Sequence, residues 1–287
     1  MSNLTQRLIT GTIFVIVLVG CIWFSPWTLF LLCLAITVLG LQEFYTLALK
    51  ANAEPQKVYG IIIGALIVTI EFLKKGAGAS IFENYLIGAV TLIFFIELFR
   101  KKSNPMSNIG WTFLGLIYIA APIAMLVHTF TPGSFIIAKW IEYPIQPYDW
   151  AGALMIFVLI WVSDSMAYVC GRLFGKRKLW ERISPKKTWE GFIGGLLFTM
   201  GTAAFFAYYS WGENVSTGRI ASWVTLGFLI SVTGMLGDLV ESLFKRSIDV
   251  KDSGTILPGH GGILDRFDAL FLALPFALSW WNLIGNL

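Results

Sequence analysis

Long apolar runs recur along the chain, and each is bounded by charged residues, by Pro or Gly, or by Asn. A helix needs about 20 apolar residues to cross the hydrocarbon of a membrane, so runs of this length are typical of spanning helices. The pattern predicts spans at about 8–25, 27–47, 57–73, 80–98, 110–131, 149–171, 189–211, 221–243 and 263–285. We therefore expect an all-α, polytopic integral membrane protein with about nine transmembrane helices.

Composition narrows the class of protein further. Of the 287 residues 56% are apolar and only 13% are charged, and the mean hydropathy is +0.73. An average soluble domain is about 25% charged, so a soluble enzyme, a disordered chain and a secreted disulfide scaffold are excluded. The net charge of +4 does not favour nucleic acid as a partner, and the three cysteines show neither metal-ligand nor disulfide spacing.

Basic residues are unevenly divided between the two predicted sides of the membrane. The amino terminus and every second loop together hold 17 of the 21 Lys and Arg residues. The opposite side holds only Lys74, Lys75, Lys139 and Arg219. Since cytoplasmic loops carry an excess of Lys and Arg, we expect the amino terminus in the cytoplasm and the carboxyl terminus outside.

One basic stretch, 172–187, lies between the sixth and seventh predicted spans. Ser184 followed by Pro185 is typical of a helix start, which would put Lys186 and Lys187 in the first helical turn. The helix dipole already makes that turn positive, so lysines there are unfavourable unless they meet an anion. The pattern predicts a phosphate site, and anchoring of the helix to lipid head groups is the alternative.

Asp164 lies inside the sixth predicted span, about eight residues before its cytoplasmic end. An acidic residue in a span costs about 2.5–3.5 kcal/mol on insertion scales, so it needs a partner or a function. Two interpretations stay open: a functional acid, or a structural one that forms an interhelical hydrogen bond or pairs with Arg172. The small residues Ser163, Ser165 and Ala167 predict close packing of a neighbouring helix.

A second charged stretch joins the last two predicted spans. Asp238, Glu241 and Lys245 recur at helical spacing on one stripe, and Asp265 and Asp268 share a face at the start of the last span. Two carboxylate groups on adjoining helices suit a hard cation, because Mg²⁺ prefers one or two carboxylates together with substrate phosphates. The spacing therefore predicts a magnesium site.

A glycine loop, Pro258-Gly259-His260-Gly261-Gly262, lies between these helices. Its glycines leave backbone N–H groups unshielded by side chains, as a polyphosphate cradle requires. His260 is a candidate general base, with a hydrogen bond to phosphate or a simple loop contact as alternatives.

Four other polar residues in the predicted spans receive structural interpretations. We expect Glu71, Glu83 and Glu97, which lie near span ends, to be solvated or to snorkel, and His128 to be a packed or interfacial histidine without a charged partner.

The stretch from Ser242 to Asp268, SLFKRSIDVKDSGTILPGHGGILDRFD, resembles the signature of the phosphatidate cytidylyltransferases, the integral membrane CDP-diacylglycerol synthases. It shows no departure from that pattern. The block from Asp164 to Gly191, which includes the run SPKKTWEG, is similar to the family's other typical block. The resemblance implies that CTP and phosphatidate react to give CDP-diacylglycerol and pyrophosphate, with Mg²⁺ as cofactor.

The resemblance and the spacing together suggest roles for the charged residues. The candidate catalytic residues are Asp265, Asp238, Lys245, Arg246 and His260. The candidate substrate-binding residues are Arg172, Lys186, Lys187, Ser242, Lys251, Asp252, Gly261, Gly262 and Arg266. The candidate metal ligands are Asp265, Asp238, Asp268 and Asp164, and a second cation beside Mg²⁺ is a further candidate.

Among the basic residues, Lys245, Arg246, Lys251 and Arg266 are expected to neutralise the triphosphate of CTP. Arg172, Lys186 and Lys187 are candidates for the phosphate of phosphatidate, and the two roles could be exchanged between the two blocks. Asp268 either binds a metal ion or orients Arg266.

The chain is accordingly expected to contain two regions. Residues 1–148 would form about five N-terminal spans, and 149–287 the catalytic helices with cytoplasmic loops 172–188 and 244–263. We expect a bacterial inner membrane location with the active site facing the cytoplasm, and a homodimer as a candidate assembly. A CTP-dependent lipid kinase and an ion-coupled transporter are the alternative functions.

Overall fold

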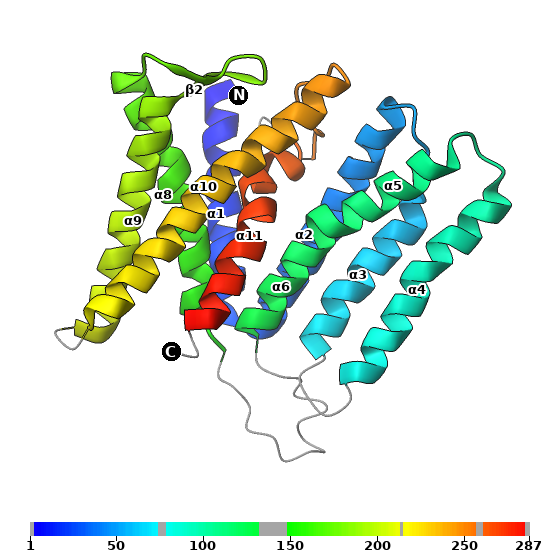
Figure 1. The fold of residues 1–287 in the computed structure, drawn as a ribbon, viewed down its shortest axis with the longest axis horizontal. Helices are drawn as coiled ribbons and strands as arrows, with labels where there is room; N and C mark the ends of the chain where they lie inside the picture. The colour runs from blue at the N-terminus through cyan, green and yellow to red at the C-terminus, as the bar shows by residue number, and fades with distance from the viewer. Residues whose placement is uncertain (1–2, 74–78, 132–147, 213–214, 257–260, 285–287) are drawn as a thin grey trace. The chain divides into compact units, whose positions relative to one another are not determined.

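The computed structural model describes residues 3–73, 79–131, 148–212, 215–256 and 261–284 (Figure 1). The chain forms two compact units. The first contains 1–153 together with 247–266, and the second contains 154–246 together with 267–287. Residues 247–266 therefore belong with the N-terminal helices, although they form part of the second charged stretch. The predicted functional division at residue 148 stays a prediction.

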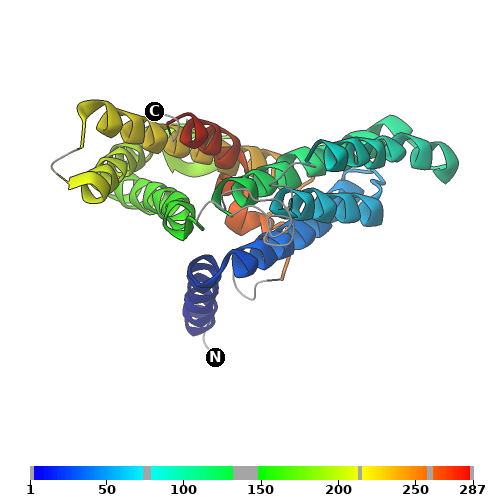
Figure 2. The same cartoon turned by 90° about the horizontal axis from the view of Figure 1, so that it is seen from below.

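Helices that follow one another closely along the chain build the first unit. They are α1 (Asn3–Phe24), α2 (Pro26–Lys50), α3 (Lys57–Leu73), α4 (Ala79–Arg100), α5 (Pro105–Gly115), the π-helical turn η1 (Leu116–Ala120) and α6 (Ala121–Phe130). Within this unit α3, α4 and the α5–α6 helix lie side by side (Figure 1), and α1 extends away from the others (Figure 2). The unit is thus a helical layer with one outlying helix.

Tyr45 joins three helices of the first unit. Its hydroxyl donates a hydrogen bond to the carbonyl oxygen of Thr112, at 2.9 Å. A Cβ atom at Gly60 would lie 2.5 Å from the Tyr45 hydroxyl oxygen, and one at Gly115 would lie 2.6 Å from the Tyr45 ring. The two glycines therefore let α3 and α5 approach the tyrosine of α2 without a steric clash.

Glu97 and His128 differ from their predictions. Glu97 is 5% exposed and accepts hydrogen bonds from Gln56, Arg100 and Asn108, at 2.6 to 2.9 Å. The Nδ1 atom of His128 lies 2.9 Å from a carboxylate oxygen of Glu71. The predictions of a solvated or snorkelling Glu97 and of a His128 without a charged partner are wrong, because Asn108, Gln56 and Glu71 lie on other segments and supply partners that local spacing does not reveal. The side chain of Glu83 lies outside the described residues.

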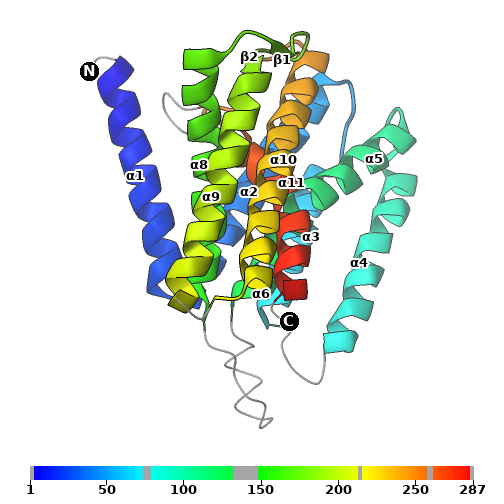
Figure 3. The same cartoon turned by 60° about the vertical axis from the view of Figure 1, so that its left-hand side comes forward.

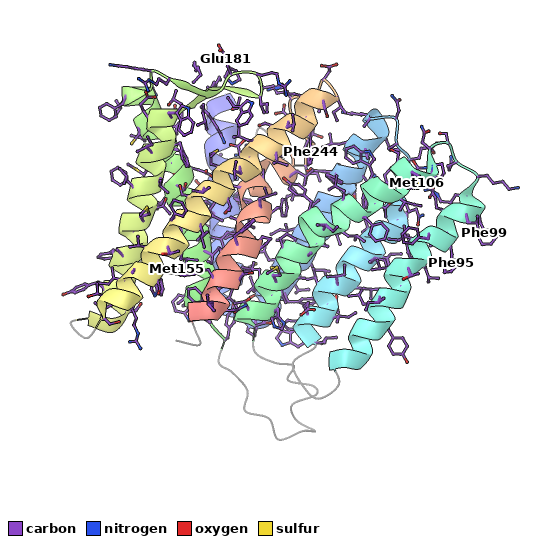
Figure 4. All side chains as sticks on the ribbon, in the orientation of Figure 1. Phe95, Phe99, Met106, Met155, Glu181 and Phe244 are labelled. Atoms are coloured by element: carbon purple, nitrogen blue, oxygen red, sulfur yellow. The ribbon has the colours of Figure 1, made fainter. Side chains whose placement is uncertain are left out.

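Large apolar side chains cover the outer side of α4. Phe95 and Phe99 project outward from this helix (Figure 4), and they are 56% and 78% exposed. Among the described residues, five helices are long and apolar enough to cross a membrane: Pro26–Lys50, Pro105–Phe130, Trp150–Phe174, Trp189–Ser210 and Thr217–Ser247. The chain is therefore an all-α, multi-pass membrane protein in its described parts, with one small β-hairpin.

Every predicted apolar run coincides with helical residues in the described ranges. The number of about nine spans and the cytoplasmic location of the amino terminus stay predictions.

Four helices and the hairpin make up the second unit, except for residues 150–153, 247 and 264–266 of these helices, which belong to the first unit. They are α8 (Trp150–Phe174), β1 (Lys178–Trp180), β2 (Ser184–Thr188), α9 (Trp189–Trp211), α10 (Thr217–Ser247) and α11 (Leu264–Ile284). Figure 3 shows α8, α9 and α10 side by side, with the hairpin across their upper ends. The hairpin thus lies at the end of α10 that bears the second charged stretch.

The hairpin corrects the predicted start of the seventh helix. Lys178 pairs with Thr188 and Trp180 with Ser184 in an antiparallel ladder, and the helix begins only at Trp189. The side chain of Thr188 accepts the Gly191 N–H at 3.2 Å and is the N-cap. The predicted Ser184 cap is wrong because strand pairing holds this segment extended, and an edge strand tolerates Pro185.

Glycines bring α8 and α9 close together. A Cβ atom at Gly195 would lie 2.7 Å from the carbonyl oxygen of Ser163, and one at Gly191 would lie 2.6 Å from that of Ala167. The predicted close packing against the small residues of the sixth span is confirmed for Ser163 and Ala167.

Candidate active site

Lys187 and Asp238 bring the two charged stretches together within the second unit. Lys187 lies on β2 and Asp238 on α10, and the Lys187 Nζ atom is 2.6 Å from Asp238 Oδ2. The side chains are 26% and 33% exposed, so the ion pair is accessible from outside the protein. Ser242, one helical turn after Asp238, donates a hydrogen bond to Asp238 Oδ1 at 3.3 Å. A partly exposed ion pair is weak, so a ligand can exchange with either partner.

Two more acidic residues of the second unit add negative charge to the environment of Asp238. Asp164 on α8 and Asp268 on α11 both interact electrostatically with Asp238, and Asp164 also interacts with Lys187. Helices α10 and α11 are in close contact here, since a Cβ atom at Gly237 would lie 2.6 Å from the Asp268 carbonyl oxygen. Carboxylates that repel one another are stabilised by a bound cation.

The donor set of this cluster fits Mg²⁺. Its side chains offer carboxylate and hydroxyl oxygens, which are the ligands that a hard cation prefers. In the ranges that the structure describes, no three His, Cys, Asp or Glu side chains are grouped to hold a metal ion by themselves. Mg²⁺ commonly takes one or two protein carboxylates and completes its coordination with water and substrate phosphates. That the acidic cluster supplies the protein's part of such a site stays a prediction.

Lys245 is engaged by a neighbour on its own helix. Its Nζ atom lies 2.5 Å from Oε2 of Glu241, and the two side chains are 13% and 3% exposed. Removing one member of a buried pair leaves the other charge uncompensated, so such pairs are held firmly. In this structure Lys245 neutralises Glu241, and its predicted contact with the triphosphate stays a prediction.

Asp265 belongs to the first unit, where it accepts hydrogen bonds from Ser253 and Gly262. Its Oδ2 atom accepts the Gly262 N–H at 2.8 Å, and the N–H and hydroxyl of Ser253 at 3.0 Å each. Gly261 has a φ of +84°, which favours glycine. The Gly262 N–H, predicted to face phosphate, is therefore used by Asp265. The shared cation site of Asp265 and Asp238 joins residues of different units and stays a prediction.

Glu43 on α2 is a buried acidic residue outside the set of candidates predicted from the sequence. It is 5% exposed, and its Oε2 atom accepts hydrogen bonds from the Ser253 hydroxyl at 3.2 Å and the Leu264 N–H at 3.0 Å. The signal was present in the sequence, since Glu43 interrupts the apolar run 27–47. The argument used for Asp164, that an acid in a span needs a function, applies equally to Glu43.

The remaining predicted residues lie on the surface or outside the described ranges. Exposed side chains belong to Arg172, Lys186, Arg246, Lys251, Asp252 and Arg266. Long basic side chains at a surface can extend toward a phosphate. His260 lies outside the described residues, and its role as a general base stays a prediction.

The chain is similar in sequence to a family of known enzymes. The model of the cytidylyltransferase family matches residues 5–284 of this chain. The chain is 35% identical to the phosphatidate cytidylyltransferase of Bacillus subtilis over 281 residues, which cover 96% of this chain and 97% of the relative. It is 32% identical to that of Haemophilus influenzae over 281 residues, 95% and 96% of the two chains. Identity to the Staphylococcus aureus protein of this name reaches 50% over 125 residues, 42% and 45% of the two chains.

Proposed function

Because the chain belongs to the cytidylyltransferase family, we propose that the cluster around Lys187 and Asp238 is where it transfers the cytidylyl group of CTP to phosphatidate. The enzyme makes CDP-diacylglycerol in phospholipid biosynthesis. The single observation that carries the proposed location is the 2.6 Å contact between Lys187 and Asp238, which unites both charged stretches. A lipid kinase or a transporter would also need charged residues in its site. The similar proteins, however, are named phosphatidate cytidylyltransferase, which favours neither alternative.

The reaction explains why the site needs charge rather than a protein nucleophile. An oxygen of the phosphatidate phosphate attacks the α-phosphorus of CTP and forms the new P–O bond. The bond from that phosphorus to the β-phosphate oxygen breaks, and pyrophosphate leaves with its electron pair. Such phosphoryl chemistry depends on positioning and charge neutralisation. We assign Lys187, with Lys186 and Arg172, to the lipid phosphate, and Lys245, Arg246, Lys251 and Arg266 to the nucleotide phosphates.

We further propose that Asp238 and Asp268 hold Mg²⁺, with Asp164 as a candidate ligand and Asp265 as a ligand by family resemblance. Bound Mg²⁺ would neutralise charge on the nucleotide phosphates and on the leaving pyrophosphate. The electrostatic repulsion of Asp238 by Asp164 and Asp268 supports this assignment. An active Asp265→Asn variant would remove Asp265 from the set of metal ligands.

The location in the cell follows from the substrates. Phosphatidate lies in the membrane and CTP is soluble, so the reaction needs a membrane surface that faces the nucleotide pool. The excess of Lys and Arg on one predicted side favours a cytoplasmic site in a bacterial inner membrane. A homodimer stays a prediction.

Product analysis tests the reaction itself. Purified enzyme with labelled CTP, phosphatidate and Mg²⁺ is expected to release pyrophosphate and to label the lipid. Release of CDP would instead support a lipid kinase, and the absence of any turnover would support a transporter.

Charge exchange tests the location. Lys187→Asp and Asp238→Lys are each expected to abolish turnover, because each removes a group that contacts substrate or metal. Combining the two restores an ion pair, so the double variant should regain thermal stability but not activity. Recovery of turnover in the double variant would make the pair structural and contradict the proposed site.

A further inference from the structure

Glu43 connects the N-terminal helices to the segment that carries the family signature. Among the described residues, its Oε1 atom has no hydrogen-bond partner, while its Oε2 atom accepts bonds from Ser253 and Leu264. The Ser253 hydroxyl lies 3.2 Å from Glu43 Oε2 and 3.0 Å from Asp265 Oδ2. One hydroxyl group therefore bridges a carboxylate of α2 and the carboxylate at the start of α11.

The second bond of Glu43 goes to the end of a helix. Leu264 is the first residue of α11, and the first N–H groups of a helix have no partner within it. A carboxylate at that position satisfies one of these donors and is favoured by the positive end of the helix dipole. Glu43 thus fixes the first turn of α11, in which Asp265 is the next residue.

Two glycines of the same segment are packed directly against Glu43. For Gly254, the three atoms closest to an added Cβ all belong to Glu43, and the closest, Oε1, is far inside van der Waals contact. A Cβ atom at Gly262 would meet Ser253 Oγ and Glu43 Oε2 at similarly short range. Only glycine fits at these two positions, because a side chain at either one would clash with the Glu43 carboxylate. This steric reason for the two glycines is independent of any contact with phosphate.

We propose that Glu43 is a positioning residue for Asp265: by holding Ser253 and the first turn of α11, it sets the orientation in which the Asp265 carboxylate serves cytidylyl transfer. This rests on the proposed function of Asp265. Partners that orient a metal ligand typically contribute about 10- to 100-fold to affinity or activity. The N-terminal helices thus contribute to the chemistry through a specific contact, in addition to crossing the membrane.

A double-mutant cycle between positions 43 and 254 tests the contact. Glu43→Ala and Gly254→Ala are each expected to lower kcat by about 10- to 100-fold, with the KM for CTP changed by less than about threefold. In the Glu43→Ala background the added methyl group meets no carboxylate, so Gly254→Ala should cause little further loss. Losses that simply multiply, or full activity of Glu43→Ala, would overturn the proposal. Gln42→Ala, which alters the exposed neighbour of Glu43, is the matched control and should keep full activity.

A conservative variant separates positioning from general damage to the fold. Glu43→Gln keeps one side-chain oxygen that can accept both hydrogen bonds, so it is expected to retain turnover that Glu43→Ala loses. If Glu43→Gln is as inactive as Glu43→Ala although both remain folded, the hydrogen bonds do not carry the effect and the proposal is wrong.

Amide hydrogen exchange tests the hydrogen bond between Glu43 and Leu264 independently of turnover. In Glu43→Ala the Leu264 amide should exchange at least about tenfold faster, because it loses its acceptor, while amides in α9 remain unchanged. Unchanged exchange at Leu264 would overturn the anchor itself. Faster exchange with undiminished turnover would show that the anchor has no role in catalysis. A wrong location of the proposed site would show itself in a different experiment, because the Lys187 and Asp238 variants would then retain turnover.

Discussion

Asp238 and Asp265 are held in opposite ways, although both belong to the charged stretches that identify the family. Asp238 faces a lysine ammonium group and a serine hydroxyl, both on side chains that can rotate away. Asp265 accepts backbone N–H groups of Ser253 and Gly262, which move only if the loop moves. One carboxylate has exchangeable partners, and the other is fixed by the backbone.

This difference indicates different kinds of sensitivity to substitution. A carboxylate with side-chain partners can change them when substrate or cation arrives, at the small cost of breaking an exposed ion pair. A carboxylate held by backbone N–H groups is preorganised, and changes in the loop act on it indirectly. The four substitutions below test this comparison, starting with the largest expected effect.

Asp238→Asn is expected to have the largest effect. It removes the charge that binds Lys187 and, in the proposed site, Mg²⁺, so kcat should fall about a thousandfold. Pyrophosphate release from the purified variant measures this loss. Glu181→Gln, an exposed acid in the hairpin turn (Figure 4), is the control and should retain wild-type turnover. An Asp238→Asn enzyme with more than a tenth of wild-type kcat would place the cation elsewhere.

Lys187→Ala should follow, with a loss in kcat/KM of about a hundredfold, which is typical when one group that stabilises phosphate charge is removed. Initial rates at varied phosphatidate and CTP assign the defect to one substrate. Lys178→Ala removes the same charge from an exposed position of the neighbouring strand and should change these rates by less than about twofold. Equal losses in the two variants would mean that Lys187 acts only by a general attraction of anions and does not bind a particular phosphate.

Ser253→Ala is expected to have a smaller effect than either. It removes the hydroxyl between Glu43 and Asp265 but keeps the backbone N–H bonds, so the cost should be about 1 kcal/mol, or about fivefold in kcat. Steady-state rates and thermal unfolding of the same preparation measure both consequences. Asp265→Asn is expected to abolish turnover, and an equally large loss in Ser253→Ala would mean that the backbone bonds alone do not hold this carboxylate.

Ser163→Ala should have the smallest effect on activity. The hydroxyl oxygens of Ser163 and Ser231 are 2.9 Å apart in the buried contact of α8 and α10. Hydrogen bonds between membrane helices average about 0.6 kcal/mol, so the variant should lose that much stability and almost no turnover. Thermal unfolding in detergent is the measurement. Loss of turnover at unchanged stability would instead bring Ser163 into the site next to Asp164.

Local patterns predicted the helices well because each needs only a run of apolar residues to form in a membrane. The hairpin was not predicted, since Ser184-Pro185 suits both a helix start and an edge strand, and pairing with Lys178–Trp180 decides between them. Spacing along one helix did predict that Asp238, Glu241 and Lys245 share one stripe of α10. It could not reveal that Lys187 meets Asp238, because that contact joins residues far apart in sequence.

Glu43 shows the same limit more strongly. Its partners Ser253 and Leu264 lie more than two hundred residues away in the chain, at separations of 210 and 221. No periodicity connects such positions. The sequence could have flagged Glu43 as a charge in an apolar run, but only the folded chain shows which loop it contacts.

The steric fit between Gly254 and Glu43 also constrains how this sequence can change over generations. A side chain at position 254 is tolerated only after position 43 has become smaller, whereas loss of the carboxylate first removes the contacts to Ser253 and Leu264. Each route passes through an impaired intermediate, so the two positions form an epistatic pair. Related lineages that keep Glu43 should therefore keep Gly254, and chimeras that bring Glu43 together with a side chain at position 254 should be impaired.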